Sequence, residues 1–368
     1  MAFFEEFVLL YPVYALLFAD HGLSAGQIST LFVIWSLTSF LLEIPSGAWA
    51  DAFSRRRLLV LSPLLTAAGF GLWTFLPGYW SFVAGFVLWG VATAISSGTS
   101  EALVYEELAR LDASGAYPRI TGRAEAVGTT AMMIASAVAG PAMAFGGYQA
   151  VGVASMATLV AAALIARTLP ETREQPEEAD GYLDVLRAGF REVSRSKTLL
   201  RRLALVSAVT GLSAFDEYLP LLAQGTGVGD EAVPPLMVLV SAGFAIGGFL
   251  AGRGLRWAGP ITCAGGLALI AGAAVRSPWG FVLVAAAFGA IQWAIAAADA
   301  RLQDGLSDRS RATVTSMSGL GTEVMAVLTF AFYGLGSELA PSWVLFAALA
   351  APYTIIGAFQ GRSAEKST

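Results

Sequence analysis

Twelve apolar stretches, separated by charged or Gly/Pro-rich breaks, constrain the fold of this chain more than any other feature. A membrane-spanning helix needs roughly 17 to 25 mostly apolar residues, and the stretches have lengths of that order. A chain that is 56% hydrophobic and 13% charged also has more apolar side chains than a water-soluble protein of 368 residues can bury. We therefore predict an all-α polytopic membrane protein with twelve transmembrane helices, near residues 3–19, 28–49, 58–76, 81–104, 124–145, 148–166, 203–223, 232–251, 259–275, 279–298, 312–332 and 343–359.

The distribution of arginine predicts which helix ends face the cytoplasm, because cytoplasmic loops collect Lys and Arg. Alternate loops hold the arginines that lie between predicted spans, whereas the opposite loops carry only Arg276. Adding or removing one helix would scatter arginines over both faces. We therefore predict a multi-pass protein of the cell membrane with both termini in the cytoplasm. The arginines of the predicted cytoplasmic loops are Arg55 to Arg57; Arg110, Arg119 and Arg123; those from Arg167 to Arg202; Arg253 and Arg256; and Arg301, Arg309 and Arg311.

One break is much longer than the others and divides the chain. The segment 170–202 begins with a Pro- and Glu-rich run and continues with apolar residues at helical spacing opposite basic ones. That pattern predicts a linker followed by an amphipathic helix on the inner membrane surface. We predict an N-terminal six-helix half at residues 1–169, a cytoplasmic linker at 170–202 and a C-terminal six-helix half at 203–368.

Short sequence matches roughly 200 residues apart indicate that the two halves are related. The segment 14–19 in the first predicted helix resembles 218–223 in the seventh, and two further matches follow in the same order. These further matches pair Gly47 with Gly248 and Glu101 with Asp299. Their order and nearly constant spacing predict two parallel, pseudo-symmetric halves.

A glycine, an acid and an arginine cluster lie between the second and third predicted helices. With this loop, the twelve helices and the central basic break, the chain resembles the major facilitator superfamily of secondary transporters. That family's signature runs Gly, three residues, Asp, Arg or Lys, any residue, Gly, then two Arg or Lys, and here Ala52 and Ser54 depart from it. The matching residues are Gly47, Asp51, Arg55 and Arg56. The resemblance implies two six-helix halves that rock to give alternating access.

The charge of Asp51 suggests a gate at this loop. A carboxylate that docks on the N-terminus of another helix, or on an arginine, would form a contact present only when the cytoplasmic side is closed. We expect Gly47, Asp51, Arg55 and Arg56 to form such a gating loop. The alternative is a solvated loop that only marks the cytoplasmic face.

A second pattern bears on the direction of transport. Gly140-Pro141 resembles a Gly-Pro pair that the family's drug/proton antiporters carry in helix 5. Ser136 replaces an expected glycine, and the closing glycine pair is displaced to Gly146-Gly147. The resemblance implies an exporter, whereas the alternative is a kink that only serves helix packing.

Acidic residues inside predicted spans are candidates for proton coupling, because an ionisable group there costs a few kcal/mol and usually faces a cavity or a partner. Glu323 lies near the middle of its helix and is the first candidate. Asp216 and Glu217 are the second, and Glu43 the third. The alternative for each acid is a hydrogen-bonding role between helices.

The remaining candidate residues are acids and aromatics that could line a substrate pathway. No Arg or Lys falls in the middle of a predicted helix, although anion carriers need a positive group there. The composition therefore favours a neutral or cationic, partly apolar solute. The pathway candidates are Tyr11, Tyr14, Trp89, Glu101, Trp293 and Asp299.

These features together predict a secondary transporter. We expect proton-coupled export of a small neutral or cationic amphipathic molecule, with proton-coupled uptake of a neutral nutrient as the alternative. An enzyme would need a nucleophile, metal cluster or phosphate-binding motif, and a sensor would need a signalling domain; the sequence suggests neither. We expect a monomer that needs no cofactor or metal, whose partners are the lipid bilayer, the solute and protons, and which binds no nucleic acid.

Overall fold

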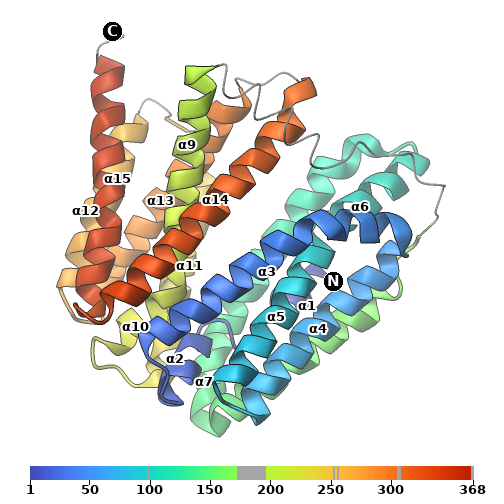
Figure 1. Ribbon diagram of the computed structural model, residues 1–368, viewed down its shortest axis with the longest axis horizontal. Helices are drawn as coiled ribbons and strands as arrows, with labels where there is room; N and C mark the ends of the chain where they lie inside the picture. The colour runs from blue at the N-terminus through green and yellow to red at the C-terminus, as the bar shows by residue number, and fades with distance from the viewer. Residues whose placement is uncertain (98, 172–195, 252, 255–256, 305–307, 366–368) are drawn as a thin grey trace. The chain divides into compact units, whose positions relative to one another are not determined.

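A computed structural model describes residues 1–97, 99–171, 196–251, 253–254, 257–304 and 308–365 (Figure 1). For the helical residues 44–52, 308–313, 316 and 361–365, the description covers the backbone alone. Every regular element within these ranges is a helix. Contacts divide the chain into two compact units, Met1–Glu178 and Ala179–Thr368. The predicted amphipathic helix of the linker falls within 172–195, outside the described residues.

The first unit consists of long apolar helices with two short helices at its N-terminal end. Helices α4 and α7 pack along each other, and α5 packs on both α3 and α4 (Figure 1). The elements are α1 (Ala2–Glu6), α2 (Tyr14–Asp20), α3 (Ala25–Ala52), α4 (Arg55–Phe75), α5 (Tyr79–Ser96), α6 (Thr99–Arg110), the 3₁₀ helix η1 (Ser114–Ala116) and α7 (Tyr117–Ala166).

The second unit repeats this pattern of long helices. Helix α12 packs on α13 and α15, α11 packs on α13, and α9 packs on α14. The elements are α9 (Lys197–Leu212), η2 (Ser213–Tyr218), α10 (Leu219–Gln224), η3 (Asp230–Ala232), α11 (Val233–Leu250), α12 (Ala258–Ala274), α13 (Gly280–Gln303), α14 (Asp308–Gly336) and α15 (Ser342–Glu365).

The predicted class of helical membrane protein is confirmed. Within the described ranges, nine helical segments are long and apolar enough to cross a bilayer, and α12 is a shorter apolar helix. The 50 residues of α7 contain two predicted spans, which meet where Gly147 has φ 59°. A side chain is disfavoured at such a φ, so the Gly146-Gly147 pair makes the turn between the spans. The first predicted span, in contrast, is interrupted between α1 and α2. Twelve helices therefore remain a prediction.

The membrane orientation gives a first testable prediction. In a chain whose native Cys263 is replaced by alanine, cysteines introduced at Ser24, Gly78 or Gly229 should react with an impermeant maleimide added outside intact cells. A cysteine at Ser114, in a predicted cytoplasmic loop, is the matched control and should react only after the membrane is opened. Labelling of any of the first three sites only from the cytoplasmic side would contradict the twelve-helix topology.

Candidate functional site

The second unit has an interruption within one apolar span. The span Lys197–Gln224 runs through α9, then through the 3₁₀ helix η2, and then through α10. A 3₁₀ segment inside a long helix often marks a hinge or a functional site. Both Asp216 and Glu217 lie in η2, so two of the predicted coupling acids sit at the interruption.

Side chains from other helices satisfy the backbone next to this interruption. The hydroxyl of Tyr353 in α15 donates to the Val209 carbonyl at 2.8 Å, and Thr329 in α14 donates to the Gly211 carbonyl at 3.4 Å. Irregular backbone inside a membrane is tolerated only where such partners or a cavity satisfy its polar groups. The interruption is therefore supported by α14 and α15.

Helix α14 passes directly beside the interruption. A Cβ atom at Gly211 would overlap the Met325 side chain and the Thr322 carbonyl oxygen. Glu323 lies between these two contact residues and is half-buried. Two turns further along α14, the Tyr333 ring stacks on Tyr218 at the end of η2, with centroids 3.6 Å apart. The structure thus brings the three main coupling candidates, Asp216, Glu217 and Glu323, onto two adjacent segments.

The first unit is interrupted at the corresponding place. Residues 7–13 separate α1 from α2, and they directly precede the segment that matches 218–223 in the repeat. The Ser155 hydroxyl oxygen accepts a hydrogen bond from the Leu10 backbone N–H at 3.0 Å. Interrupted helices at corresponding positions of two halves are typical of substrate and ion sites in transporters.

Three aromatic rings form a stack next to the first interruption. Tyr11 lies in the interrupted segment, and its ring stacks on Trp89 of α5 with centroids 5.6 Å apart. Trp35 of α3 also stacks on Trp89, with centroids 5.0 Å apart. All three side chains are half-buried. The Trp35 indole nitrogen is buried and has no hydrogen-bond partner among the residues that the structure describes.

Two other predicted pathway residues have packing roles. Tyr14 is only 4% exposed and lies within a cluster of aromatic rings. Trp293 is also 4% exposed, and its indole N–H donates to the Leu250 carbonyl at 3.1 Å, which ties α13 to α11. These contacts account for both side chains without a solute.

Three predicted acids lie away from the interruptions of their own units. The side chains of Glu43 in α3, Glu101 in α6 and Asp299 in α13 are all exposed. Two further acids that the sequence analysis did not single out, Glu5 and Glu6, lie in α1 beside the first interruption. Both lie inside the first predicted span, and the cost of an ionisable group there could have identified them as candidates.

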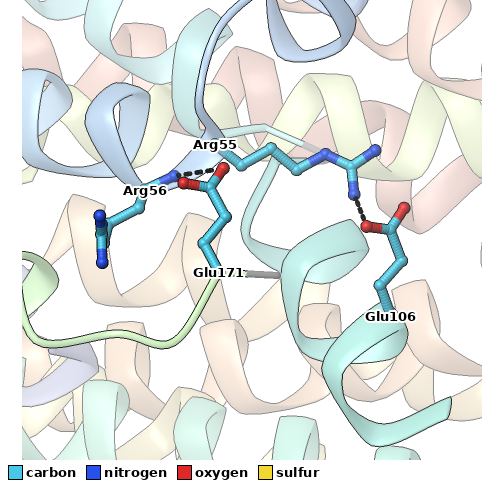
Figure 2. Close-up of polar contacts among 4 residues, drawn as sticks. All are labelled: Arg55, Arg56, Glu106 and Glu171. Carbon is cyan, nitrogen blue, oxygen red and sulfur yellow. Dashed lines mark hydrogen bonds and ion pairs between the residues drawn. The ribbon is translucent and has the colours of Figure 1, made fainter. Parts of the chain in front are cut away.

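Arg55 and Arg56 of the predicted gating loop lie at the start of α4 (Figure 2). Arg55 forms an ion pair with Glu106 of α6. The Ser54 hydroxyl caps α4 by accepting from the Arg57 N–H at 3.2 Å, and it donates to the Glu171 carboxylate at 2.5 Å. Glu171 also accepts from the Arg56 N–H at 3.4 Å. This loop is therefore tied to α6 and to the end of the first unit.

Sequence reasoning placed the arginines of this loop but missed their acidic partners. Glu106 lies within α6 and Glu171 follows α7, and no local spacing connects them with Arg55 or Arg56. Gly47 and Asp51 lie in the last turns of α3, and their side chains are outside the described part of the chain.

The surroundings of Glu171 lower the pKa of its carboxyl. Partial burial acts to raise this pKa, but hydrogen bonds from the Ser54 hydroxyl and from the Arg56 and Arg55 backbone, with the Arg56 charge, outweigh it. A carboxylate at a helix N-terminus is stabilising. A group with a depressed pKa stabilises the folded state above its unfolded pKa, and that contribution is lost as pH falls through its folded pKa.

Glu171→Gln should therefore lower the free energy of unfolding at pH 7 by an amount on the order of 0.5 kcal/mol, because solvent screens this partly exposed group. The difference from the parent should shrink as the pH falls through the lowered pKa of Glu171 and vanish below it. Thermal unfolding in detergent over a series of decreasing pH values measures it. Glu125→Gln removes an exposed carboxylate inside α7 and should have no such effect; an equal effect of both variants would exclude the capping role.

A comparison with known proteins assigns the chain to a family. The sequence profile of the Major Facilitator Superfamily matches residues 1–341. The chain belongs to the major facilitator superfamily. No curated protein sequence matches it. As a member of this superfamily it is a membrane transporter and not an enzyme.

Solved transporter structures resemble this superfamily member over nearly its whole length. The nucleoside transporter NupG is 14% identical, with a TM-score of 0.71, and the match covers 99% of this chain and 97% of that one. A POT family peptide transporter is 12% identical with a TM-score of 0.73, covering 99% and 95%. A D-xylose-proton symporter is 13% identical with a TM-score of 0.68, covering 98% and 94%. At such identities the likeness shows the fold alone.

Proposed function

We propose that the protein couples the movement of a small, neutral or cationic amphipathic solute to the movement of protons, and that it works by alternating access. The observation that carries this proposal is the group of acids at the interrupted span of the second unit. Asp216 and Glu217 lie in η2, and Glu323 lies on α14 between the residues that contact Gly211, two residues before η2.

The position of these acids supports proton coupling. A charged carboxylate inside a membrane-spanning segment is costly, whereas its protonated form is tolerated. A carboxyl group that is open to one side and then to the other can therefore take up a proton on one side and release it on the other. Glu323 is the preferred coupling residue, because it lies near the middle of α14 and is far from both ends of that helix.

The aromatic stack supports a solute that carries a ring. Tyr11, Trp89 and Trp35 present nearly parallel, half-buried rings, and the interplanar angles are 13° and 30°. Aromatic faces attract other rings and organic cations. The unpartnered indole N–H of Trp35 would gain a hydrogen bond from an acceptor on the solute, and a buried donor left alone costs roughly 1–3 kcal/mol.

The gating loop remains part of the proposal. The ion pair of Arg55 with Glu106 fixes the start of α4, and it would hold the preceding end of α3 in place. Asp51 would then act as a latch that engages when the cytoplasmic side closes. The alternative is a loop with only a structural and topological role.

We rank the two possible directions of transport, export and uptake. Export is favoured by Gly140-Pro141, which lies inside the first span of α7. The Gly146-Gly147 pair adds nothing to this argument, because it forms the turn between two spans. Uptake is the second candidate and is favoured by the likeness to a D-xylose-proton symporter. Accumulation in right-side-out and inverted vesicles separates the two.

A screen of ligand-induced thermal shifts tests the solute class. Neutral or cationic ring-containing solutes should raise the melting temperature of the purified protein, and anionic solutes should not. Trp89→Ala should weaken binding of the best solute about two- to tenfold, because loss of a ring contact costs roughly 0.5–1.5 kcal/mol and 1.4 kcal/mol is a factor of ten.

Trp80→Ala is the matched control for this variant. Trp80 lies on the same helix, α5, but is 78% exposed, so its replacement should leave binding unchanged. Equal affinity of Trp89→Ala and the parent for every solute that binds would remove the stack from the pathway.

A further inference from the structure

A pocket of about 510 Å³ opens on the surface of the first unit, between α4 and the last turns of α7. The two helices lie side by side (Figure 1). One end of the pocket is basic and is formed by Arg56, Arg57 and Arg167. The remainder is apolar and includes Val60, Leu64, Val160 and Leu164. The pocket is therefore divided into a charged part and a hydrocarbon part.

Helical spacing explains this division. Arg56, Val60 and Leu64 are four residues apart on α4 and share one face. On α7, Val160 and Leu164 are followed after one more turn by Arg167. The two stripes run side by side because α4 begins where α7 ends.

The directions of these helices place all the arginines at one end. Leu59 of α4 packs with Ala166 of α7 in one cluster, and Thr74 meets Gly152 near the opposite ends of the helices. The helices are therefore antiparallel. Each apolar stripe ends in arginine at the same edge of the unit, which is the predicted cytoplasmic edge.

The apolar part of the pocket faces outward. Leu64 is 40% exposed, Val160 42% and Leu164 57%. Exposed leucine and valine on membrane-spanning helices contact lipid chains. Arginine above such a surface lies at the depth of lipid headgroups, where its planar guanidinium binds phosphate through two hydrogen bonds.

We propose that this pocket binds an anionic phospholipid, with its phosphate on Arg57 and Arg167 and one acyl chain along the apolar stripes. Basic pockets between transmembrane helices on the cytoplasmic side suit such headgroups. Arg56 contributes less, because the Glu171 carboxylate lies beside its backbone N–H. A soluble phosphate would use the basic end but gain nothing from the apolar one. The site is separate from the proposed solute pathway.

Native mass spectrometry of the full chain in detergent tests the site, with phosphatidylglycerol and phosphatidylcholine of the same acyl chains as probes. The parent should bind one phosphatidylglycerol more tightly than any phosphatidylcholine. The double variant Arg57→Gln/Arg167→Gln should bind that lipid about thirtyfold more weakly, since each arginine near an anionic surface contributes roughly a factor of five. Arg119→Gln/Arg123→Gln removes two exposed arginines of the same unit outside the pocket and should bind as the parent does.

Two further measurements distinguish a lipid-binding site from a site for soluble phosphate. Excess glycerol 3-phosphate should not displace the lipid, and Leu164→Trp, which fills the exposed apolar stripe, should weaken lipid binding. Arg167→Gln alone provides the same test if the double variant does not fold. The proposal is overturned by equal binding of the two lipids, by equal losses in the pocket and control variants, or by displacement with glycerol 3-phosphate.

Discussion

Glu323→Gln should abolish solute accumulation driven by a proton gradient while leaving solute binding in place. Glutamine keeps the shape of the side chain and a hydrogen-bond donor, but it cannot release a proton. A gradient of one pH unit supports roughly tenfold accumulation if one proton moves with each solute, so the accumulation ratio should fall from about ten to about one. Uptake of labelled solute into proteoliposomes with and without the gradient measures this ratio.

The same variant separates coupling from a structural role. If Glu323 is the coupling acid, the variant should still bind the solute but show no gradient-driven accumulation. Glu338→Gln changes an exposed acid just beyond α14 and should behave as the parent. Unchanged active transport by Glu323→Gln would make Glu323 a hydrogen-bonding link between helices. Coupling would then have to be sought with Asp216→Asn and Glu217→Gln.

Gly247→Ala should strongly destabilise the second unit. Helices α11 and α13 meet backbone to backbone here, and a Cβ atom at Gly247 would overlap the Gly289 carbonyl oxygen. Since the obstacle is main chain, the helices must separate, which costs roughly 1–3 kcal/mol. Small residues at such contacts let membrane helices approach closely. A larger residue, as in Gly247→Leu, should leave little folded protein.

The neighbouring glycine supplies the control for this prediction. A Cβ atom at Gly248 would be 3.9 Å from the Gln292 side chain, which is ordinary contact. Alanine also favours helix over glycine by roughly 0.5–1 kcal/mol, so Gly248→Ala should be neutral or stabilising. Melting temperatures of the two purified variants measure the contrast. Equal stability would mean that α11 and α13 are not packed this closely.

The sequence was sufficient for the class of fold, and it located the acids that lie within apolar stretches, because both depend on local composition. A long apolar stretch must span the bilayer as a helix whatever surrounds it. An acid inside such a stretch, such as Glu323, stands out by its cost alone. The repeat also pointed to the segment 218–223, which begins at the last residue of η2.

The interruptions themselves could not be predicted, because their cause is tertiary. Hydropathy averaged over the span Lys197–Gln224 is that of a continuous helix. The irregular backbone is supported by Tyr353 and Thr329, which lie more than one hundred residues further along the chain. The partners of Arg55 and Arg56 were missed for the same reason.

The roles of individual aromatic residues could not be predicted from the sequence either. Trp89 and Trp293 both lie in apolar stretches, and nothing in their spacing separates them. Only the packing shows that Trp89 joins a half-buried stack, whereas Trp293 is used to hold α13 against α11. The glycine pair Gly146-Gly147 likewise gains its meaning from the left-handed φ of Gly147.

Proton movement in liposomes tests the central claim most directly. Purified protein is placed in vesicles that contain a pH-sensitive dye, with no initial pH gradient, and the best solute from the thermal-shift screen is added outside. We expect the solute to change the internal pH of vesicles that contain the parent protein but not of vesicles that contain Glu323→Gln. Movement of the solute through the parent protein with no change in internal pH would contradict proton-coupled transport.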